Sequence, residues 1–141
     1  MPLASALLTV AVLVAVAMIA GVVWRLRDGR RRRGRGAVDA TALGLPAGRV
    51  AVVLFGTETC SRCPQVRRML QNVASGHPDV EFVDVDLTLR PDIASRHRVL
   101  TTPTTFVVSA QGTVAARFVG VPQRAELTAA LSEQPIPQEA S

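Results

Sequence analysis

Two cysteines separated by two residues are the most reactive side chains of this chain, and they are its only cysteines. They stand in the motif Cys60-Ser61-Arg62-Cys63. A thiolate at the first position can attack a disulfide, and a thiol one helical turn further on can resolve the mixed disulfide that forms. The spacing therefore predicts a reactive dithiol. Two buried structural cysteines, or half of a metal site, are the alternatives.

The sequence contains few residues that could complete a metal site with the two cysteines. His77 and His97 are the only histidines, and the chain has no third cysteine. A structural zinc site takes four such ligands. We therefore expect neither a metal ion nor another cofactor.

The residues around the cysteine pair predict the strand that precedes it and the helix that follows it. Residues 50–55 form a continuous apolar run, typical of a strand buried on both faces. Apolar residues at steps of three and four predict a helix over 61–74. Cys60 would lie at the N-terminal end of that helix, where free N–H groups, the helix dipole and nearby Arg62 stabilise a thiolate. We expect the pKa of the Cys60 thiol to lie below the roughly 8.5 of a free cysteine.

Cys63 should face inward from the helix and act as the resolving thiol. Pro64 follows it directly, and proline fits a helix without loss only in the first turn. The helix should therefore begin slightly later than Cys60, near Ser61, or leave the Cys60 carbonyl unpaired.

Further elements complete an α/β domain. The patterns predict strands at 80–85, 104–108 and 113–119 and helices at 91–98 and 123–131. The first two strands are joined by a helix and should be parallel, whereas the last two form a hairpin around Gln111-Gly112. The expected fold is a mixed four-stranded sheet flanked by helices.

An apolar run precedes this domain. Residues 3–24 carry no charge, and a helix of that length rises about 33 Å, enough to cross a bilayer core of roughly 30 Å. The alternative is a cleaved signal peptide, which needs a basic start, a shorter core and a small-residue cleavage site. The opening Met1-Pro2-Leu3-Ala4-Ser5 has no basic side chain. We therefore predict an uncleaved transmembrane anchor over 1–24.

The positive charge of the chain is concentrated beside this run. Seven of the sixteen basic residues, all arginines, lie from Arg25 to Arg35, with Asp28 as the only acid among them. From Gly36 onward nine arginines face ten acids. A cluster beside a membrane span indicates contact with anionic lipid headgroups rather than with nucleic acid. Basic flanks stay in the cytoplasm, so we expect the N-terminus outside and the rest of the chain inside.

The remaining boundaries follow from composition. Gly44, Pro46 and Gly48 interrupt residues 37–48, so 25–48 is expected to be an Arg-rich juxtamembrane segment and a flexible linker. The folded domain should span 49–133. Residues 134–141, with Pro135 and Pro137, should form a flexible tail.

Two segments together resemble the thioredoxin-like family over about residues 49–133. They are Phe55-Gly56-Thr57-Glu58-Thr59-Cys60-Ser61-Arg62-Cys63 and Thr102-Pro103-Thr104, and Gly112 and Gly120 fall at matching places in the hairpin and after the last strand. The resemblance implies a thioredoxin-like fold and thiol–disulfide exchange at Cys60 and Cys63. It also implies that Pro103 is a cis-proline beside the cysteines and that the backbone of Thr102 pairs with a substrate segment.

The chain departs from the family pattern around the motif. Thr59 stands where thioredoxins carry Trp, Ser61-Arg62 replaces Gly-Pro, and Leu54 replaces a buried Asp. Without that carboxylate, proton removal from Cys63 would need water or another group. Glu58 is the nearest candidate, although a solvated turn residue is its favoured interpretation. We expect Arg62 and Glu58 to tune the dithiol.

Three polar residues receive structural interpretations. His97 is expected to pack where many relatives place an aromatic residue. Asp84 and Asp86 are expected to be solvated at a strand end rather than to bind a metal.

The leading functional hypothesis is a membrane-anchored, cytoplasm-facing thiol–disulfide oxidoreductase. Its expected partners are disulfide-containing proteins near the membrane, an upstream thiol reductant, and membrane lipid at Arg25 to Arg35, with no nucleic acid. The same chemistry on the other side of the membrane would make an envelope thiol reductase or assembly factor. A redox-inert adaptor that binds a membrane partner is the hypothesis from a different class.

Overall fold

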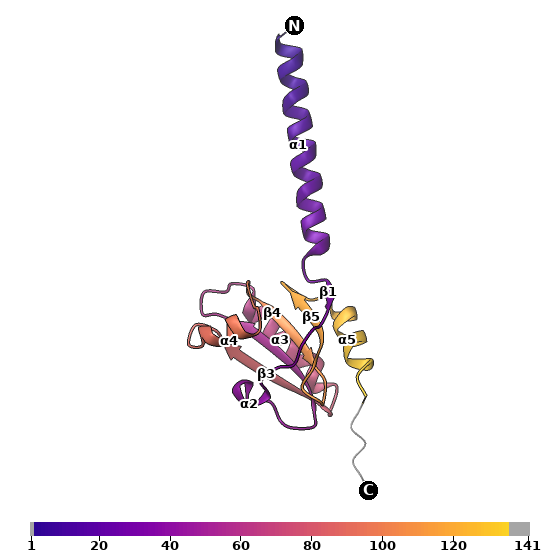
Figure 1. Ribbon diagram of the computed structural model, residues 1–141. Helices are drawn as coiled ribbons and strands as arrows, with labels where there is room; N and C mark the ends of the chain where they lie inside the picture. The colour runs from indigo at the N-terminus through magenta and orange to yellow at the C-terminus, as the bar shows by residue number, and fades with distance from the viewer. Residues whose placement is uncertain (1, 136–141) are drawn as a thin grey trace.

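A long apolar helix projects from a small α/β domain in the computed structural model, which describes residues 2–135 (Figure 1). Helix α1 spans Pro2–Arg27, and none of its residues is buried. Its most apolar window has a mean hydropathy of 2.8, which makes it the one helix in the described range able to cross a membrane. A signal sequence near the N-terminus can satisfy the same criteria of length and apolar composition.

A five-stranded mixed sheet forms the centre of the domain, in the order β1-β5-β4-β2-β3. Strands β2 (Val50–Gly56) and β3 (Val80–Asp86) are parallel, as the helical crossover between them requires. Strand β4 (Thr104–Val108) is antiparallel to β2 and to β5 (Val114–Val119). The predicted α/β fold is therefore confirmed, with one strand more than the four expected.

Helices cover the two faces of the sheet unequally. On one face α3 (Cys63–Ser75) and α5 (Arg124–Ser132) pack on an apolar cluster that includes Leu54, Leu70 and Phe118. The other face carries only the short helices α2 (Ala40–Leu43) and α4 (Pro91–Arg96). Every residue of β2 is buried, because both faces of this central strand are covered.

The additional strand β1 comes from the arginine cluster. Arg31–Arg33 pairs antiparallel with β5, with Arg32 opposite Arg117. Arg31 also binds the α5 side of the domain, where its backbone N–H donates to Glu126 and its guanidinium pairs with Glu133. Contact of the arginines from Arg25 to Arg35 with lipid headgroups stays a prediction, because pairing of the β1 backbone leaves the side chains of Arg32 and Arg33 exposed.

The segment predicted as a flexible linker is also structured in part. Asp39 caps α2 by accepting a hydrogen bond from the Ala42 backbone N–H, and Gly44 ends the helix with a φ of 69°. Val38 and Leu43 are buried in the core under α4. Burial of these two apolar side chains explains why the segment packs on the domain. Of the predicted flexible tail, residues 136–141 lie outside the described residues.

Candidate active site

The two cysteines form a disulfide between the end of β2 and the start of α3. Their Cα atoms are 5.4 Å apart. The Cys60 N–H donates to the Thr57 carbonyl and the Cys63 N–H donates to the Cys60 carbonyl, at 3.2 and 3.4 Å. Cys63 is only 1% exposed, whereas Cys60 is half-buried. Solvent and a disulfide substrate therefore reach the Cys60 sulfur more readily than the Cys63 sulfur.

Helix α3 begins two residues later than predicted. Arg62 precedes its first residue, Pro64 lies in its first turn, and the Val66 N–H donates to the Arg62 carbonyl. Cys60 therefore lies in the turn that leads into α3, not in the helix. The cause is Pro64. Proline has no N–H to donate to a carbonyl one turn earlier, so it fits only in the first turn of a helix.

Cys63 is buried, and its sulfur lies against Gly56. A Cβ on Gly56 would lie 3.0 Å from Cys63 Sγ, so the glycine allows the sulfur to pack against the end of β2. Leu54, at the position of the missing carboxylate, is fully buried in the core under α3 and α5. Glu58 is exposed, and its backbone N–H donates to the Thr88 hydroxyl. Its tuning role stays a prediction, because no described contact joins its carboxylate to either cysteine.

The loop before β4 contains the predicted cis peptide, between Thr102 and Pro103. Pro103 is buried, and its carbonyl accepts a 2.8 Å hydrogen bond from the Gly120 N–H at the end of β5. The Thr104 hydroxyl donates to the Thr101 carbonyl at 2.7 Å. This bonding fixes the loop against the last strand, and Thr102 remains partly accessible. Substrate binding at Thr102 and Pro103 stays a prediction.

Asp28 is a site residue that the sequence analysis did not select. Its carboxylate accepts a 2.7 Å hydrogen bond from the guanidinium of Arg62, which lies between the two cysteines in the chain. The same carboxylate lies so close to Gly120 that a Cβ there would overlap it. The next residue, Gly29, donates its N–H to the Val119 carbonyl at 2.7 Å. The first residues after α1 therefore link the end of β5 to the turn that carries the two cysteines, residues 57–63, which we call the cysteine turn.

The sequence held one signal for this contact. Asp28 is the only acid among seven arginines, and a lone acid in a basic run is a candidate partner for a distant arginine. Which arginine it would meet depends on the tertiary fold, because Arg62 is 34 residues away in the chain.

The polar residues assigned structural roles behave differently from one another. His97 packs between α4 and the sheet, with its ring 6.1 Å from that of Phe55 and 6.5 Å from that of Phe106, so its packing role is confirmed. Asp84 is exposed and pairs with Arg67 of α3. Asp86 accepts from the Thr88 N–H. Over residues 2–135 no three His, Cys, Asp or Glu side chains gather as a metal site would require.

Solved structures share this architecture. A thioredoxin from Fasciola hepatica is 26% identical, with a TM-score of 0.55 over 63% of this chain and 84% of its own. The oxidised mitochondrial thioredoxin 3 of Saccharomyces cerevisiae is 25% identical, with a TM-score of 0.53 over 60% and 77%. Thioredoxin 1 of Thermosipho africanus, at 20% identity, has the same fold, with a TM-score of 0.51 over 58% and 90%.

The sequence itself gives the family assignment. No curated protein matches the chain at a significant level. The thioredoxin family model, however, matches residues 45–133, which contain the cysteine pair, the cis-proline loop and β2 to α5. This chain belongs to the thioredoxin family.

Proposed function

We propose that this protein is a membrane-anchored thiol–disulfide oxidoreductase that reduces or exchanges disulfides of proteins close to the membrane. A thioredoxin domain with a close cysteine pair supports thiol–disulfide chemistry in general. The observation that carries the finer assignment is the difference in burial between the half-buried Cys60 and the buried Cys63. Cys60 is then the nucleophile and Cys63 the resolving residue.

The reaction starts from the reduced pair. The Cys60 thiolate attacks one sulfur of the substrate disulfide, forms a mixed disulfide, and releases the other substrate sulfur as a thiolate that takes up a proton. The Cys63 thiolate then attacks the Cys60 sulfur, which breaks the mixed disulfide. The products are the Cys60–Cys63 disulfide and a fully reduced substrate. An upstream dithiol returns the pair to the reduced state and is itself oxidised.

The anchor would limit which substrates the pair can reach. Asp28 follows α1 directly and pairs with Arg62, so the cysteine turn lies close to the domain end of α1. Only Asp28, Gly29 and Arg30 separate α1 from β1, in place of the long flexible tether that the sequence suggested. Substrate disulfides would therefore have to lie near the membrane surface.

We further propose that the domain lies in the cytoplasm. Seven arginines follow the apolar helix within residues 25–35, and basic flanks are retained on the cytoplasmic side. In that compartment reductants keep a dithiol reduced between turnovers. These arginines are also candidates for contact with anionic lipid.

An insulin-reduction assay on the full chain in detergent, with dithiothreitol as electron donor, tests the proposed activity. We expect turnover above the dithiothreitol background for the wild type and none above it for Cys60→Ser. Arg68→Gln, an exposed change near the middle of α3, should keep the wild-type rate. A wild type that is no faster than Cys60→Ser would contradict the proposal and favour a redox-inert adaptor.

A further inference from the structure

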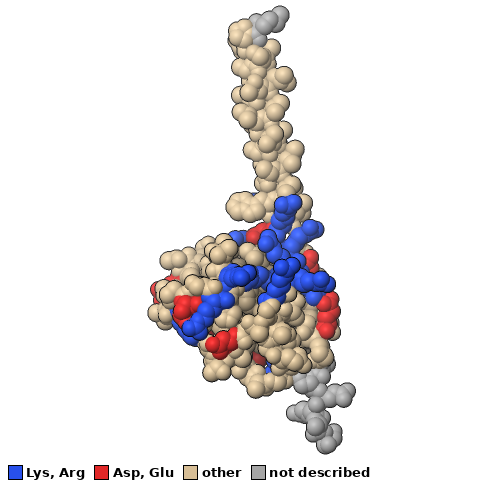
Figure 2. All heavy atoms as spheres, viewed as in Figure 1, with Lys and Arg blue, Asp and Glu red and all other residues tan. Residues whose placement is uncertain are grey.

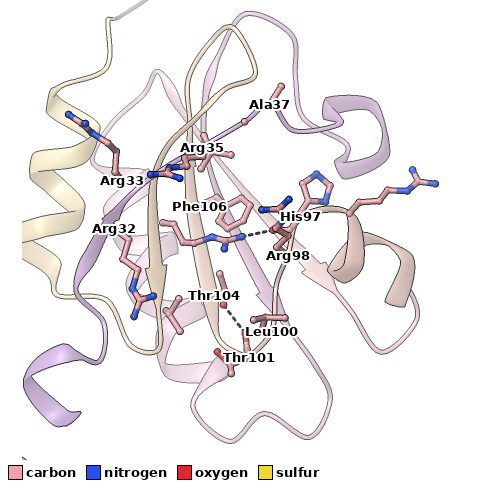
Figure 3. Close-up of a pocket in the computed structure, with 15 residues that line it drawn as sticks. Arg32, Arg33, Arg35, Ala37, His97, Arg98, Leu100, Thr101, Thr104 and Phe106 are labelled. Carbon is pink, nitrogen blue, oxygen red and sulfur yellow. Dashed lines mark hydrogen bonds between the residues drawn. The ribbon is translucent and has the colours of Figure 1, made fainter. Parts of the chain in front are cut away.

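A hollow of about 640 Å³ lies on the face of the sheet that α2 and α4 cover only in part (Figure 3). Its walls come from β1 and the residues after it, the segment after α4, and strands β4 and β5. The hollow exists because helices of four and six residues cannot cover five strands. Neither cysteine lines it, nor does Pro103, so it is distinct from the disulfide site.

Arginine side chains dominate the lining of this hollow. We call it the arginine pocket, and its arginines are Arg32, Arg33, Arg35, Arg96, Arg98 and Arg117. Figure 3 shows Arg32 and Arg33 on β1, Arg35 just after that strand, and Arg98 beside His97 after α4; Arg96 at the end of α4 and Arg117 of β5 complete the set. Figure 2 shows arginines gathered on the visible face of the domain below α1. The pocket therefore concentrates positive charge that the chain places near the membrane end.

Carboxylates do not balance this charge. Among the described residues, Arg96 is the one pocket arginine with a carboxylate within 4 Å, that of Asp39 at 3.8 Å. The other ion pairs of the described domain involve arginines outside the pocket lining. Clustered guanidinium groups without carboxylates repel one another and favour an anion between them.

Arg117 is the pocket arginine with the strongest evidence of repulsion from neighbouring positive charges. It lies directly opposite Arg32 in the β1–β5 pair, and like charges at opposing positions destabilise a sheet. Burial, followed by the positive charges of Arg32 and Arg98, lowers the pKa of Arg117. Its guanidinium is nevertheless held in place, 4.6 Å above the Phe106 ring and donating to the His97 carbonyl. Because the Arg117 side chain is already held in one position, binding an anion would cost it little conformational entropy, and the neighbouring cations add to the attraction.

We propose that the arginine pocket binds the phosphate group of an anionic ligand. Planar guanidinium groups match phosphate oxygens in bidentate geometry, and the volume lies within the range of small-ligand sites. Two sources carry this chemistry, a free phosphate compound and a phospholipid headgroup. Leu100, on the pocket wall and 92% exposed, offers an apolar surface that an acyl chain would cover. This binding goes beyond the proposed redox function, because it does not use the cysteines.

Calorimetric titration of inorganic pyrophosphate into the oxidised full chain, in neutral detergent at low salt, tests the site. The pocket variant is Arg35→Gln with Arg98→Gln, two exposed side chains that line the hollow. Its control, Arg68→Gln with Arg124→Gln, removes the same charge from exposed positions outside it. We expect binding to weaken at least about tenfold in the pocket variant and to change less than about twofold in the control. Absence of binding to the wild type, or equal losses in both variants, would overturn the proposal.

A second pair of ligands separates the two sources. Glycerol 3-phosphate and dihexanoyl phosphatidic acid carry the same phosphate, but only the latter has acyl chains. A headgroup site predicts that the lipid binds at least about tenfold more tightly, with protein-free micelles as the blank, and that Leu100→Ser removes this advantage. A site for free phosphate compounds predicts equal affinities. Either result supports the pocket, provided that Arg35→Gln with Arg98→Gln weakens both ligands, and an undiminished affinity in that variant would contradict it.

Discussion

We expect the ion pair of Arg62 with Asp28 to tune the reactivity of Cys60. Arg62 follows Cys60 by two residues in the chain, and its guanidinium would favour the Cys60 thiolate. Asp28 offsets part of that charge through their 2.7 Å contact. The side chains of Arg62 and Asp28 are 51% and 31% exposed, so solvent screens the pair and its effect is modest.

Removing either partner should change the reactivity of Cys60 in opposite directions. We expect Asp28→Asn to speed iodoacetamide alkylation of reduced Cys60 at pH 7 by about two- to fivefold, because Arg62 is then unopposed. Arg62→Gln should slow it by a similar factor. Asp79→Asn, an exposed change distant in sequence from the motif, serves as the control. Equal rates in all four proteins would show that this pair does not influence the thiolate.

Gly56 controls the space behind the other cysteine. A Cβ at this position would lie 3.0 Å from Cys63 Sγ, closer than ordinary contact, and the disulfide limits how far the sulfur can move. We expect Gly56→Ala to lower the free energy of unfolding of the oxidised protein by about 1–3 kcal/mol, as overpacking does. Gly76→Ala is the control, because its Cβ would meet nothing closer than 3.5 Å. Urea denaturation curves measure both, and a neutral Gly56→Ala would refute the crowding argument.

At the scale of elements, β1 attaches helix α1 to the domain by pairing with β5 and by contacts of Arg31 with α5 and its end. The guanidinium of Arg31 lowers the pKa of Glu133, mainly by hydrogen bonding, and the Arg31 N–H donates to Glu126. The pKa of Glu133 is therefore lower in the folded protein than in the unfolded chain, where it is near 4.5. Its ionised form stabilises the folded state above pH 4.5, and this stabilisation is lost as the pH falls through the folded-state pKa.

Attachment of β1 should therefore weaken in acid. We expect amide hydrogen exchange of residues 31–33 to speed up, relative to the β2 core, as the pH drops below about 4.5, after correction for intrinsic rates. In Glu133→Gln, residues 31–33 should already exchange faster at neutral pH, and loss of the Arg31–Glu133 pair should cause no further increase in acid. Unchanged protection of β1 in Glu133→Gln would mean that strand pairing alone holds it.

Periodicity in the sequence was enough to predict the elements from β2 to α5, because each has its own apolar face or buried run. It could not predict β1, since three consecutive arginines have no alternating pattern and are held by β5 and Glu133. Helix α2 was missed for a related reason: its four residues are too few for a helical period.

The candidate site divides in the same way. The cysteines, Pro103 and Leu54 are recognisable from local sequence. The contact of Asp28 with Arg62 and Gly120 arises only when β1 returns the chain to β5, and no local pattern encodes that.

At the scale of the whole molecule, orientation decides which compartment the dithiol serves. We expect a C-terminal reporter that fluoresces only in the cytoplasm to be active and an exported enzyme reporter to be inactive, because of the arginines after α1. Neutralising Arg25, Arg27, Arg30, Arg33 and Arg35 together should give a mixed orientation. Arg68→Gln with Arg124→Gln should leave it unchanged. An active exported reporter on the wild type would move the domain to the envelope side.

Capture of a mixed disulfide tests the central claim most directly. The reduced full chain is mixed with a disulfide-containing protein, quenched with an alkylating agent, and analysed by mass spectrometry under non-reducing conditions. We predict that Cys63→Ser accumulates an adduct on Cys60, and that Cys60→Ser accumulates at least about tenfold less, because Cys63 is 1% exposed. Equal or greater capture through Cys63 would contradict the assignment of Cys60 as the nucleophile.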